Sequence, residues 1–232
     1  MKEKLIIVGT STTAHQAYDF VKYHGLYDVV GFAVDREYYK ESEFMGMPVY
    51  ELEKLDEIPG IQDTFLFIAM LWNKLNKDRK DVYYRLKSGG GGYRFANLIS
   101  PTAVIRGKLK GDNCWIHDYV VIQSDAEIGT NCMIMAHTLI GAYVSLGDHC
   151  FCGARSVIGG GASVGSQTFV GINCVVYDET KVGSQCILGA CGAIKRNVAD
   201  RTIVKPQASY MESKSYPEDV IESKLMYKCI IR

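Results

Sequence analysis

An apolar residue recurs at every sixth position through the second half of the chain, from Val104 to Ile194. Fifteen of these sixteen positions are apolar, Lys110 being the exception, and ten of them are followed directly by Gly. A period of six fits neither an α-helix nor an alternating strand, whereas it fits a short strand and a tight corner repeated without a break. Hexapeptide repeats are typical of a parallel β-helix. We therefore predict a solenoid in which three hexads form one triangular coil.

The narrow interior of such a column explains two unusual counts, 23 Gly and 8 Cys. One aliphatic residue per side points inward, and a second inward position accepts only small side chains. Cys behaves as a small hydrophobe, and five cysteines occupy this second position: Cys114, Cys132, Cys150, Cys174 and Cys186. We interpret them as core residues, and because no C-x-x-C pair occurs we expect no metal site. We interpret the repeated glycines as corner residues that adopt positive φ.

The first part of the chain has a different pattern. A buried strand over 4–9, helical spacing over 14–24 and a second strand over 29–35 predict a βαβ unit, that is, a small Rossmann-like α/β region. Ser100-Pro101 marks the junction with the solenoid. We predict three parts: an α/β domain over 1–98, a β-helix over 99–199 and a C-terminal tail over 200–232.

Composition excludes several classes of protein. The chain of 232 residues carries 26 Lys+Arg and 26 Asp+Glu, which counts against a basic nucleic-acid binder and against a disordered chain. No apolar run is long enough to span a membrane, and the first residues do not resemble a signal peptide. We expect a cytoplasmic protein with reduced thiols.

The order of a small βαβ region, a Pro-marked junction and a long hexapeptide solenoid resembles the PglD/NeuD-like bacterial nucleotide-sugar acyltransferases. The strongest likeness lies over 169–176 and 181–194. The resemblance implies a homotrimer of left-handed β-helices with acetyl-CoA bound between neighbouring columns and no metal. It further implies N-acetylation of a nucleotide-linked amino-deoxysugar used for surface glycans such as lipopolysaccharide O-antigen. O-acetylation of a sugar stays open.

The resemblance also implies two sets of binding residues. For acetyl-CoA these are the solenoid corner residues Gly153, Gly171, Ile172, Gly189 and Ala190. For the nucleotide-sugar they are residues that follow the first and second strands: Gly9, Thr10, Ser11, Thr12, Asp35 and Arg36. Backbone amides at a helix start bind phosphate, and a carboxylate after the second strand suits a ribose or base.

The general base is where this chain departs from the family. Ala142 stands at the position of the family's histidine and Tyr143 at that of its acidic partner. One alternative is that His137 or His149, which we place at exposed corner positions, serves as the base, with Arg155 one coil above His137 lowering its pKa. A second is a trimer that binds CoA and nucleotide-sugar but turns over poorly or not at all. A third is a substrate amine that is already neutral and needs little help.

Overall fold

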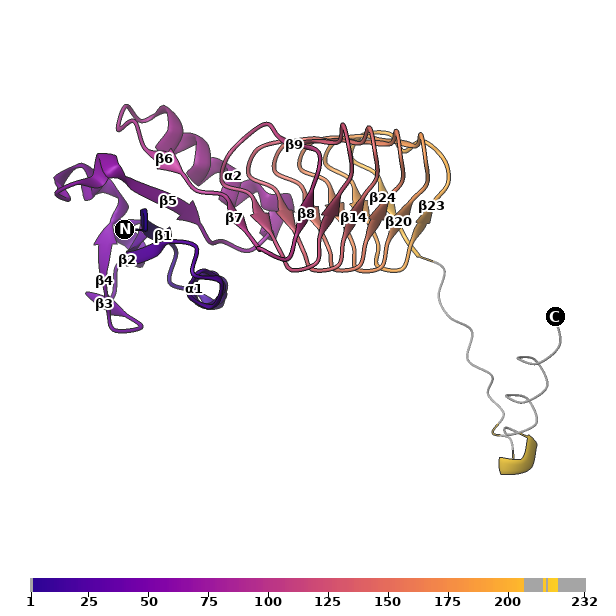
Figure 1. Cartoon of the computed structure of the whole chain (residues 1–232), viewed down its shortest axis with the longest axis horizontal. Helices are drawn as coiled ribbons and strands as arrows, with labels where there is room; N and C mark the ends of the chain where they lie inside the picture. The colour runs from indigo at the N-terminus through magenta and orange to yellow at the C-terminus, as the bar shows by residue number, and fades with distance from the viewer. Residues whose placement is uncertain (1, 207–214, 216, 221–232) are drawn as a thin grey trace.

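The structure is a computed structural model that describes residues 2–206, 215 and 217–220. A compact α/β region at the N-terminus is followed by a long column of stacked two-residue strands (Figure 1). This is the predicted architecture, a small α/β region followed by a left-handed parallel β-helix. Most of the tail predicted over 200–232 lies outside the described residues.

The N-terminal sheet has six strands in the order β3-β4-β2-β1-β5-β6, and all its pairings are parallel except that between β3 and β4. The strands are β1 (Lys4–Val8), β2 (Asp28–Val34), β3 (Glu43–Phe44), β4 (Met47–Glu51), β5 (Thr64–Ile68) and β6 (Arg94–Phe95). The helices are α1 (Thr12–His24), α2 (Asn73–Ser88) and the short 3₁₀ turns η1 (Arg36–Tyr38), η2 (Leu52–Glu57) and η3 (Ile61–Asp63). The predicted βαβ unit is therefore present as β1-α1-β2.

Alternation along β1 decides which helix covers which face of this sheet. Leu5 and Ile7 pack in one cluster with α1, whereas Ile6 and Val8 pack in another with α2. The α1 cluster also contains Trp115, Met133 and Phe151 from the outer face of the solenoid. The N-terminal region and the solenoid thus share one apolar core.

The solenoid consists of three parallel sheets. The first contains β7 (Leu98–Ile99), β10 (Trp115–Ile116), β13 (Met133–Ile134), β16 (Phe151–Cys152), β19 (Phe169–Val170), β22 (Ile187–Leu188) and β24 (Ile203–Val204). The second contains β8 (Val104–Ile105), β11 (Val121–Ile122), β14 (Leu139–Ile140), β17 (Val157–Ile158), β20 (Val175–Val176) and β23 (Ala193–Ile194). The third contains β9 (Lys108–Leu109), β12 (Glu127–Ile128), β15 (Ser145–Leu146), β18 (Ser163–Val164) and β21 (Lys181–Val182).

Three corners join these sheets, and we number them in chain order. Corner one leads from the first sheet to the second, for example over 153–155; corner two leads from the second to the third, over 141–143; corner three returns to the first, over 147–149. Residues 18 apart therefore stack at the same corner in successive coils, as Asn131 and His149 do.

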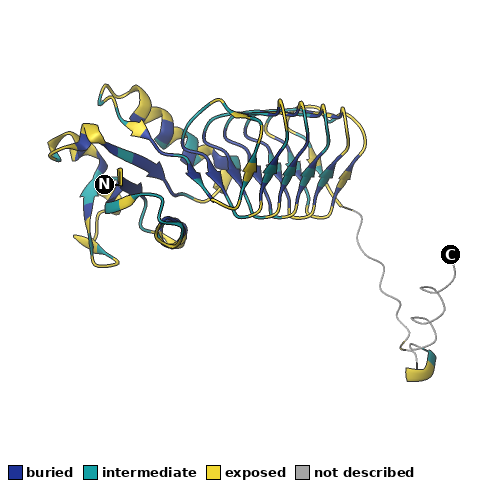
Figure 2. Ribbon diagram, viewed as in Figure 1, coloured by how far each residue is buried: buried dark blue, intermediate teal, exposed yellow. Residues whose placement is uncertain are grey.

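The predicted six-residue register is correct from Ile116 to Ile194, where every sixth residue lies in the buried core. It is wrong in the first coil. Val104 is 50% exposed, and its neighbour Ile105 packs against the core in its place. Leu109, not Lys110, is the next inward residue, because the corner between β8 and β9 is shorter than the others. The expected cysteine positions are confirmed, because all five are buried in the core. Figure 2 shows buried and half-buried residues along most of the solenoid strands.

The reason predicted for the corner glycines is wrong. None of the ten glycines that directly follow a sixth position of the repeat has positive φ. That conformation belongs to the residue three after the sixth position, such as Asn113, His137 or Gln185. At each of the ten, an added Cβ would lie only 2.3–2.7 Å from its nearest neighbour, which for most is an atom of the coil above. Glycine is required there by the close approach of successive coils, and not by backbone conformation.

The described residues form neither a membrane-spanning helix nor a cluster of metal-ligating side chains. No helix there is long and apolar enough to cross a membrane. No group of three or more His, Cys, Asp or Glu side chains there is arranged to hold a metal ion.

Candidate functional site

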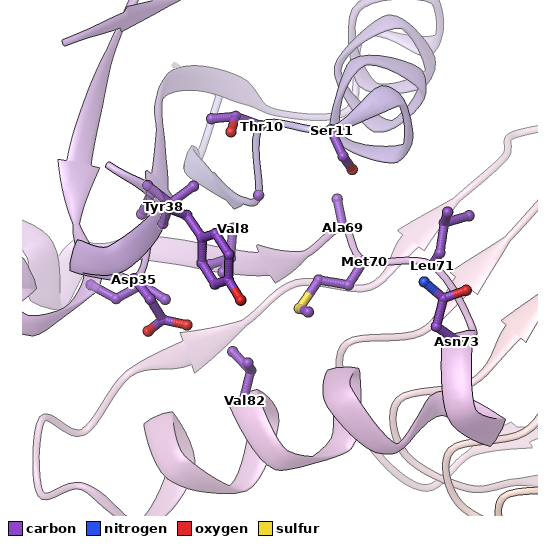
Figure 3. A pocket seen from close by; sticks show the side chains of 14 residues that line it. Val8, Thr10, Ser11, Asp35, Tyr38, Ala69, Met70, Leu71, Asn73 and Val82 are labelled. Carbon is purple, nitrogen blue, oxygen red and sulfur yellow. The ribbon is translucent and has the colours of Figure 1, made fainter. Parts of the chain in front are cut away.

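A cavity of about 380 Å³ opens at the carboxyl ends of β1, β2 and β5 (Figure 3). It lies where the strand order reverses: β1 and β2 are joined through α1, whereas β5 reaches the other side of β1 from a distant part of the chain. Ligands of open parallel sheets bind at this kind of point. Its lining includes Gly9, Thr10, Ser11, Asp35 and Tyr38, together with apolar side chains.

The loop after β1 brings the backbone close to this cavity. Gly9 has φ 123°, and a Cβ there would lie 3.0 Å from the carbonyl oxygen of Ala69, so any other residue would strain the turn. Ser11 precedes α1, and its side chain makes no capping hydrogen bond. The first backbone N–H groups of a helix lack intrahelical acceptors and carry partial positive charge. This loop therefore suits an anionic group such as a phosphate.

The structure brings together four of the six predicted nucleotide-sugar residues, namely Gly9, Thr10, Ser11 and Asp35. Thr12 and Arg36 are not among the lining residues. The Arg36 side chain instead donates to Glu51 at 2.7 Å, and its backbone N–H donates to Glu53.

Two residues that the sequence analysis did not single out complete this side of the cavity. Tyr38 projects a ring into it, and Arg85 of α2 forms an ion pair with Asp35. Arg85 is 50 residues from Asp35 and only the fold brings it there, whereas Tyr38 follows Asp35 in the short turn η1, so that its closeness in the sequence was a signal that could have found it.

The predicted acetyl-CoA residues gather at corner one. Gly153, Gly171 and Gly189 stack there in successive coils, and each leaves its space to the backbone or proline ring above. Ile172, 55% exposed, and the exposed Ala190 stand beside them. The result is a shallow edge of small residues along the outside of the column. Because Gly153 and Gly171 are buried, the accessible surface of this edge comes from Ile172 and Ala190.

His137 lies at the same corner, one coil below Arg155. Its side chain is exposed and stacks on Tyr119, with ring centroids 5.0 Å apart and planes 17° apart. Its backbone N–H donates to Asp118 of the coil below. Of the two candidate bases, His137 is the one that shares a corner with the predicted acetyl-CoA contacts.

The exposed position predicted for His149 is wrong, because α2 covers corner three. His149 is only 2% exposed. Its Nδ1 lies 2.8 Å from Asn131 Nδ2 and its Nε2 lies 3.1 Å from the Tyr84 hydroxyl. Burial, partly opposed by the nearby Asp148, lowers the pKa of His149 to about 4, so the ring is neutral near pH 7.

Ala142 and Tyr143 lie at corner two, away from the predicted acetyl-CoA contacts of the same chain. The Ala142 N–H donates to Gln123 Oε1 at 3.0 Å, and the Tyr143 side chain is 71% exposed. Corner two next to Ala142 carries three consecutive glycines, Gly159 to Gly161, and a Cβ on Gly160 would meet nothing closer than 3.5 Å. There is therefore free space at Gly160, one coil above Ala142.

Comparisons with known proteins agree with this description. The family model described as bacterial transferase hexapeptide (six repeats) matches residues 111–142. No curated protein sequence matches the chain.

Among solved structures, a mutant of perosamine N-acetyltransferase from Caulobacter crescentus in complex with CoA and GDP-perosamine is 24% identical. The match covers 86% of this chain and 92% of that one, with a TM-score of 0.74. The acetyltransferase domain of PglB from Neisseria gonorrhoeae, in complex with acetyl coenzyme A, is 18% identical over 89% and 98% of the two chains, with a TM-score of 0.76. WeeI from Acinetobacter baumannii has a TM-score of 0.58 at 13% identity, over 86% of this chain and 94% of that one. The predicted resemblance to hexapeptide-repeat nucleotide-sugar acyltransferases is confirmed in repeat and in fold.

Proposed function

For a chain that carries the bacterial transferase hexapeptide repeat and folds like two acetyltransferases, we propose acetyl-CoA-dependent N-acetylation of a nucleotide-linked amino sugar. The observation that carries this proposal is the cavity at the ends of β1, β2 and β5, with a phosphate-binding loop on one side and Asp35 on another. A hexapeptide solenoid alone is compatible with many acceptors, and the added cavity narrows the choice to a nucleotide-linked one.

The cavity residues have separate roles in this proposal. Gly9, Thr10 and Ser11 hold the diphosphate through backbone amides and hydroxyl groups. Tyr38 and the apolar lining enclose the base, and Asp35, held by Arg85, accepts hydrogen bonds from the ribose or base. No solenoid residue lines the cavity. The sugar must therefore extend out of the cavity to reach acetyl-CoA on the solenoid.

The solenoid supplies the thioester. Acetyl-CoA lies along corner one, with its pantetheine arm against Gly153, Gly171 and Gly189 and beside Ile172 and Ala190. The acceptor nitrogen attacks the thioester carbonyl, a C–N bond forms, the C–S bond breaks and the CoA thiolate leaves. The proton lost by nitrogen passes to a base or to that thiolate. His137 is our candidate base, because it is exposed at corner one.

We further propose a homotrimer that works on substrates for surface glycans in the cytoplasm. In this trimer, the cavity of one chain lies close to corner one of a neighbouring chain. The nucleotide-sugar and acetyl-CoA then meet between two subunits. Sedimentation equilibrium tests the assembly, and a monomer at micromolar concentration contradicts it.

A thiol-release assay with acetyl-CoA and UDP-, dTDP- and GDP-amino sugars tests the reaction. We expect release with at least one acceptor and a product with an N-acetyl group by mass spectrometry; an O-acetyl product would correct the acceptor atom. His137→Asn keeps a residue that tolerates positive φ and removes the base, so we expect kcat to fall about 100-fold. Asp125→Asn, an exposed residue with the same backbone conformation at corner two, is the matched control and should leave kcat unchanged.

Ala142 favours a second candidate, a trimer that binds both ligands without turnover. CoA and nucleotide binding by calorimetry, with no thiol release from any acceptor, would replace the enzyme by this alternative. Ala142→His then distinguishes a missing base from a missing acceptor, because a large gain in rate requires an otherwise complete site.

A further inference from the structure

The last residue of β5, Ile68, is held at both backbone polar groups by side chains outside the sheet. Its N–H donates to Asn113 Oδ1 at 2.9 Å, and its carbonyl oxygen accepts from Arg79 Nε at 3.1 Å. Asn113 belongs to corner three of the solenoid, and Arg79 to α2. The end of a strand in the N-terminal sheet is therefore attached to the solenoid.

Arg79 is fully buried and is satisfied by carbonyl groups. Besides Ile68, its guanidinium donates to the carbonyl oxygens of Asn131 at 2.5 Å and Asn113 at 2.8 Å. No ion pair involves it in the described part of the chain. Burial lowers its pKa to about 10, which leaves it charged near pH 7. The three carbonyl oxygens offset part of the cost of burying this charge, and the planar guanidinium holds them in one geometry.

A chain of hydrogen bonds continues from Ile68 along corner three. Asn113 Nδ2 donates to Asn131 Oδ1 at 2.6 Å. Asn131 Nδ2 then faces His149 Nδ1, which must accept, so the ring proton is on Nε2 and is donated to Tyr84. Each member donates to the next, from the sheet through the solenoid and back to α2. The direction of the whole chain is set by the Ile68 N–H.

This attachment determines where one wall of the cavity lies. Ala69, which follows Ile68, lines the cavity with Met70 and Leu71. The Ala69 N–H donates to the Val8 carbonyl at 2.9 Å, and the Ala69 carbonyl oxygen is the atom that excludes a side chain at Gly9. A shift of Ile68 is therefore passed directly to the loop after β1.

We propose that Arg79 and Asn113 are positioning residues of the cavity: they attach the end of β5 to corner three and so preorganise the nucleotide-binding loop at a fixed place relative to the solenoid. Neither lines the cavity. The inference rests on the proposed function for the identity of the ligand. The attachment itself rests on the hydrogen bonds of Ile68.

Asn113→Gly is the main test. Glycine adopts the positive φ of 57° found at Asn113 without strain, so the substitution removes the side chain and leaves the corner unstrained. We expect faster amide hydrogen exchange over 69–72 and 8–11, and a dissociation constant for GDP, UDP or dTDP raised about tenfold. The dissociation constant for CoA should stay unchanged, which a general loss of structure would not allow. Gln185→Gly, an exposed position with φ 58° at the same corner, is the matched control.

Two further variants separate positioning from simple interface loss. Lys80→Met removes a contact between α2 and the solenoid, the 2.7 Å bond to Gln167, that does not involve Ile68, so nucleotide affinity should be unchanged. Asn113→Asp keeps the acceptor for the Ile68 N–H and places a carboxylate beside Arg79. The hydrogen-bond chain can then reverse, with Tyr84 donating to His149, and we expect affinity to be restored to within about twofold of the wild type.

Each outcome decides the inference. Unchanged exchange over 69–72 and unchanged nucleotide affinity in Asn113→Gly overturn it, as does an equal loss in Lys80→Met. If the wild-type protein binds none of the three nucleotides, the proposed function fails. The exchange data then decide the positioning role alone: acceleration confined to 69–72 and 8–11 supports it, and no acceleration overturns it.

Discussion

Two histidines, the buried His149 and the half-buried His117, make the stability of this protein depend on pH. His117 stacks on Trp115, with ring centroids 4.6 Å apart, and His149 lies under α2. Burial lowers the pKa of each ring to about 4, against an ordinary value of 6.5. Between pH 6.5 and 4 the unfolded chain therefore binds more protons than the folded one. The free energy of unfolding is full above pH 6.5 and falls as the pH is lowered through this window.

For His149, which is almost fully buried, we expect a loss of about 2 kcal/mol between pH 7.5 and pH 5. Urea unfolding at the two pH values measures it, provided that the assembly state is the same at both. In His149→Asn the loss should be smaller by about that amount, because asparagine does not titrate and tolerates the positive φ at this corner. Equal pH dependence in the variant and the wild type would contradict the assignment of His149 as a neutral buried ring.

At the scale of the element, the corners of the solenoid limit which substitutions it tolerates more than the strands do. A Cβ on Gly165 would lie 2.5 Å from the backbone nitrogen of Ser184 in the coil above, whereas one on Gly160 would meet nothing closer than 3.5 Å. Neither residue has positive φ, so the two sites differ only in space. The stacked coils cannot separate at one corner without lengthening their strand hydrogen bonds.

We therefore expect Gly165→Ala to reduce the free energy of unfolding by about 1–3 kcal/mol and Gly160→Ala to leave it unchanged or raise it slightly. Denaturant unfolding of both variants under one condition measures the difference. Similar free energies would show that the close approach at Gly165 is easily relieved, and the requirement for glycine at the corners would need another cause.

The hexad pattern predicted the elements of the solenoid well because each strand is specified locally. The inward positions from Ile116 to Ile194 follow from a repeat of six residues. This unit is shorter than the 18 residues that separate stacked positions in successive coils. The same pattern gave the wrong inward residues in the first coil because its corners differ in length from those of the later coils. Polarity could not correct the register, since Val104 and Ile105 are equally apolar. Pairing with β11 places Ile105 beside the inward Ile122, so Ile105 and not Val104 packs against the core.

At the scale of the whole molecule, both tryptophans report on the contact between the N-terminal region and the solenoid. Trp115 of β10 packs against Phe20 of α1 and Phe67 of β5, with centroid distances of 5.7 Å to each. Trp72, before α2, stacks on Phe169 of β19 at 4.7 Å. The shared core around Trp115 joins the two regions, and Trp72 packs at its edge against the partly buried Phe169. The division at residues 98 and 99 stays a prediction, and Leu98 lies in the solenoid strand β7 and also belongs to this core.

We expect one cooperative thermal transition, in which tryptophan fluorescence and far-ultraviolet circular dichroism give the same midpoint. Trp72→Phe leaves Trp115 as the only reporter and should keep the midpoints together. A fluorescence change well below the loss of secondary structure would show that the regions separate before they unfold.

The candidate site shows how far sequence reasoning reached. Gly9, Thr10, Ser11 and Asp35 were predicted from the family resemblance, by their places after the first and second strands, and the structure gathers them at one cavity. Arg85 was missed because it lies 50 residues from Asp35, whereas Tyr38 was missed although it follows Asp35 in the turn η1. His149 was misplaced because hexad position describes only the solenoid, and it is α2, far away in the sequence, that covers its corner.

The sequence alone therefore determined the repeat, the core of the column, the βαβ order and the loop after β1, because each depends on spacing within a few residues. Only the tertiary structure decided which corner is covered, which histidine is left exposed at corner one, and how the cavity is held. Those features depend on contacts such as Ile68 with Asn113, 45 residues apart, and Arg79 with Asn131, 52 residues apart. Partners at such separations are selected by the packing of two regions against each other, which no periodicity within either region contains.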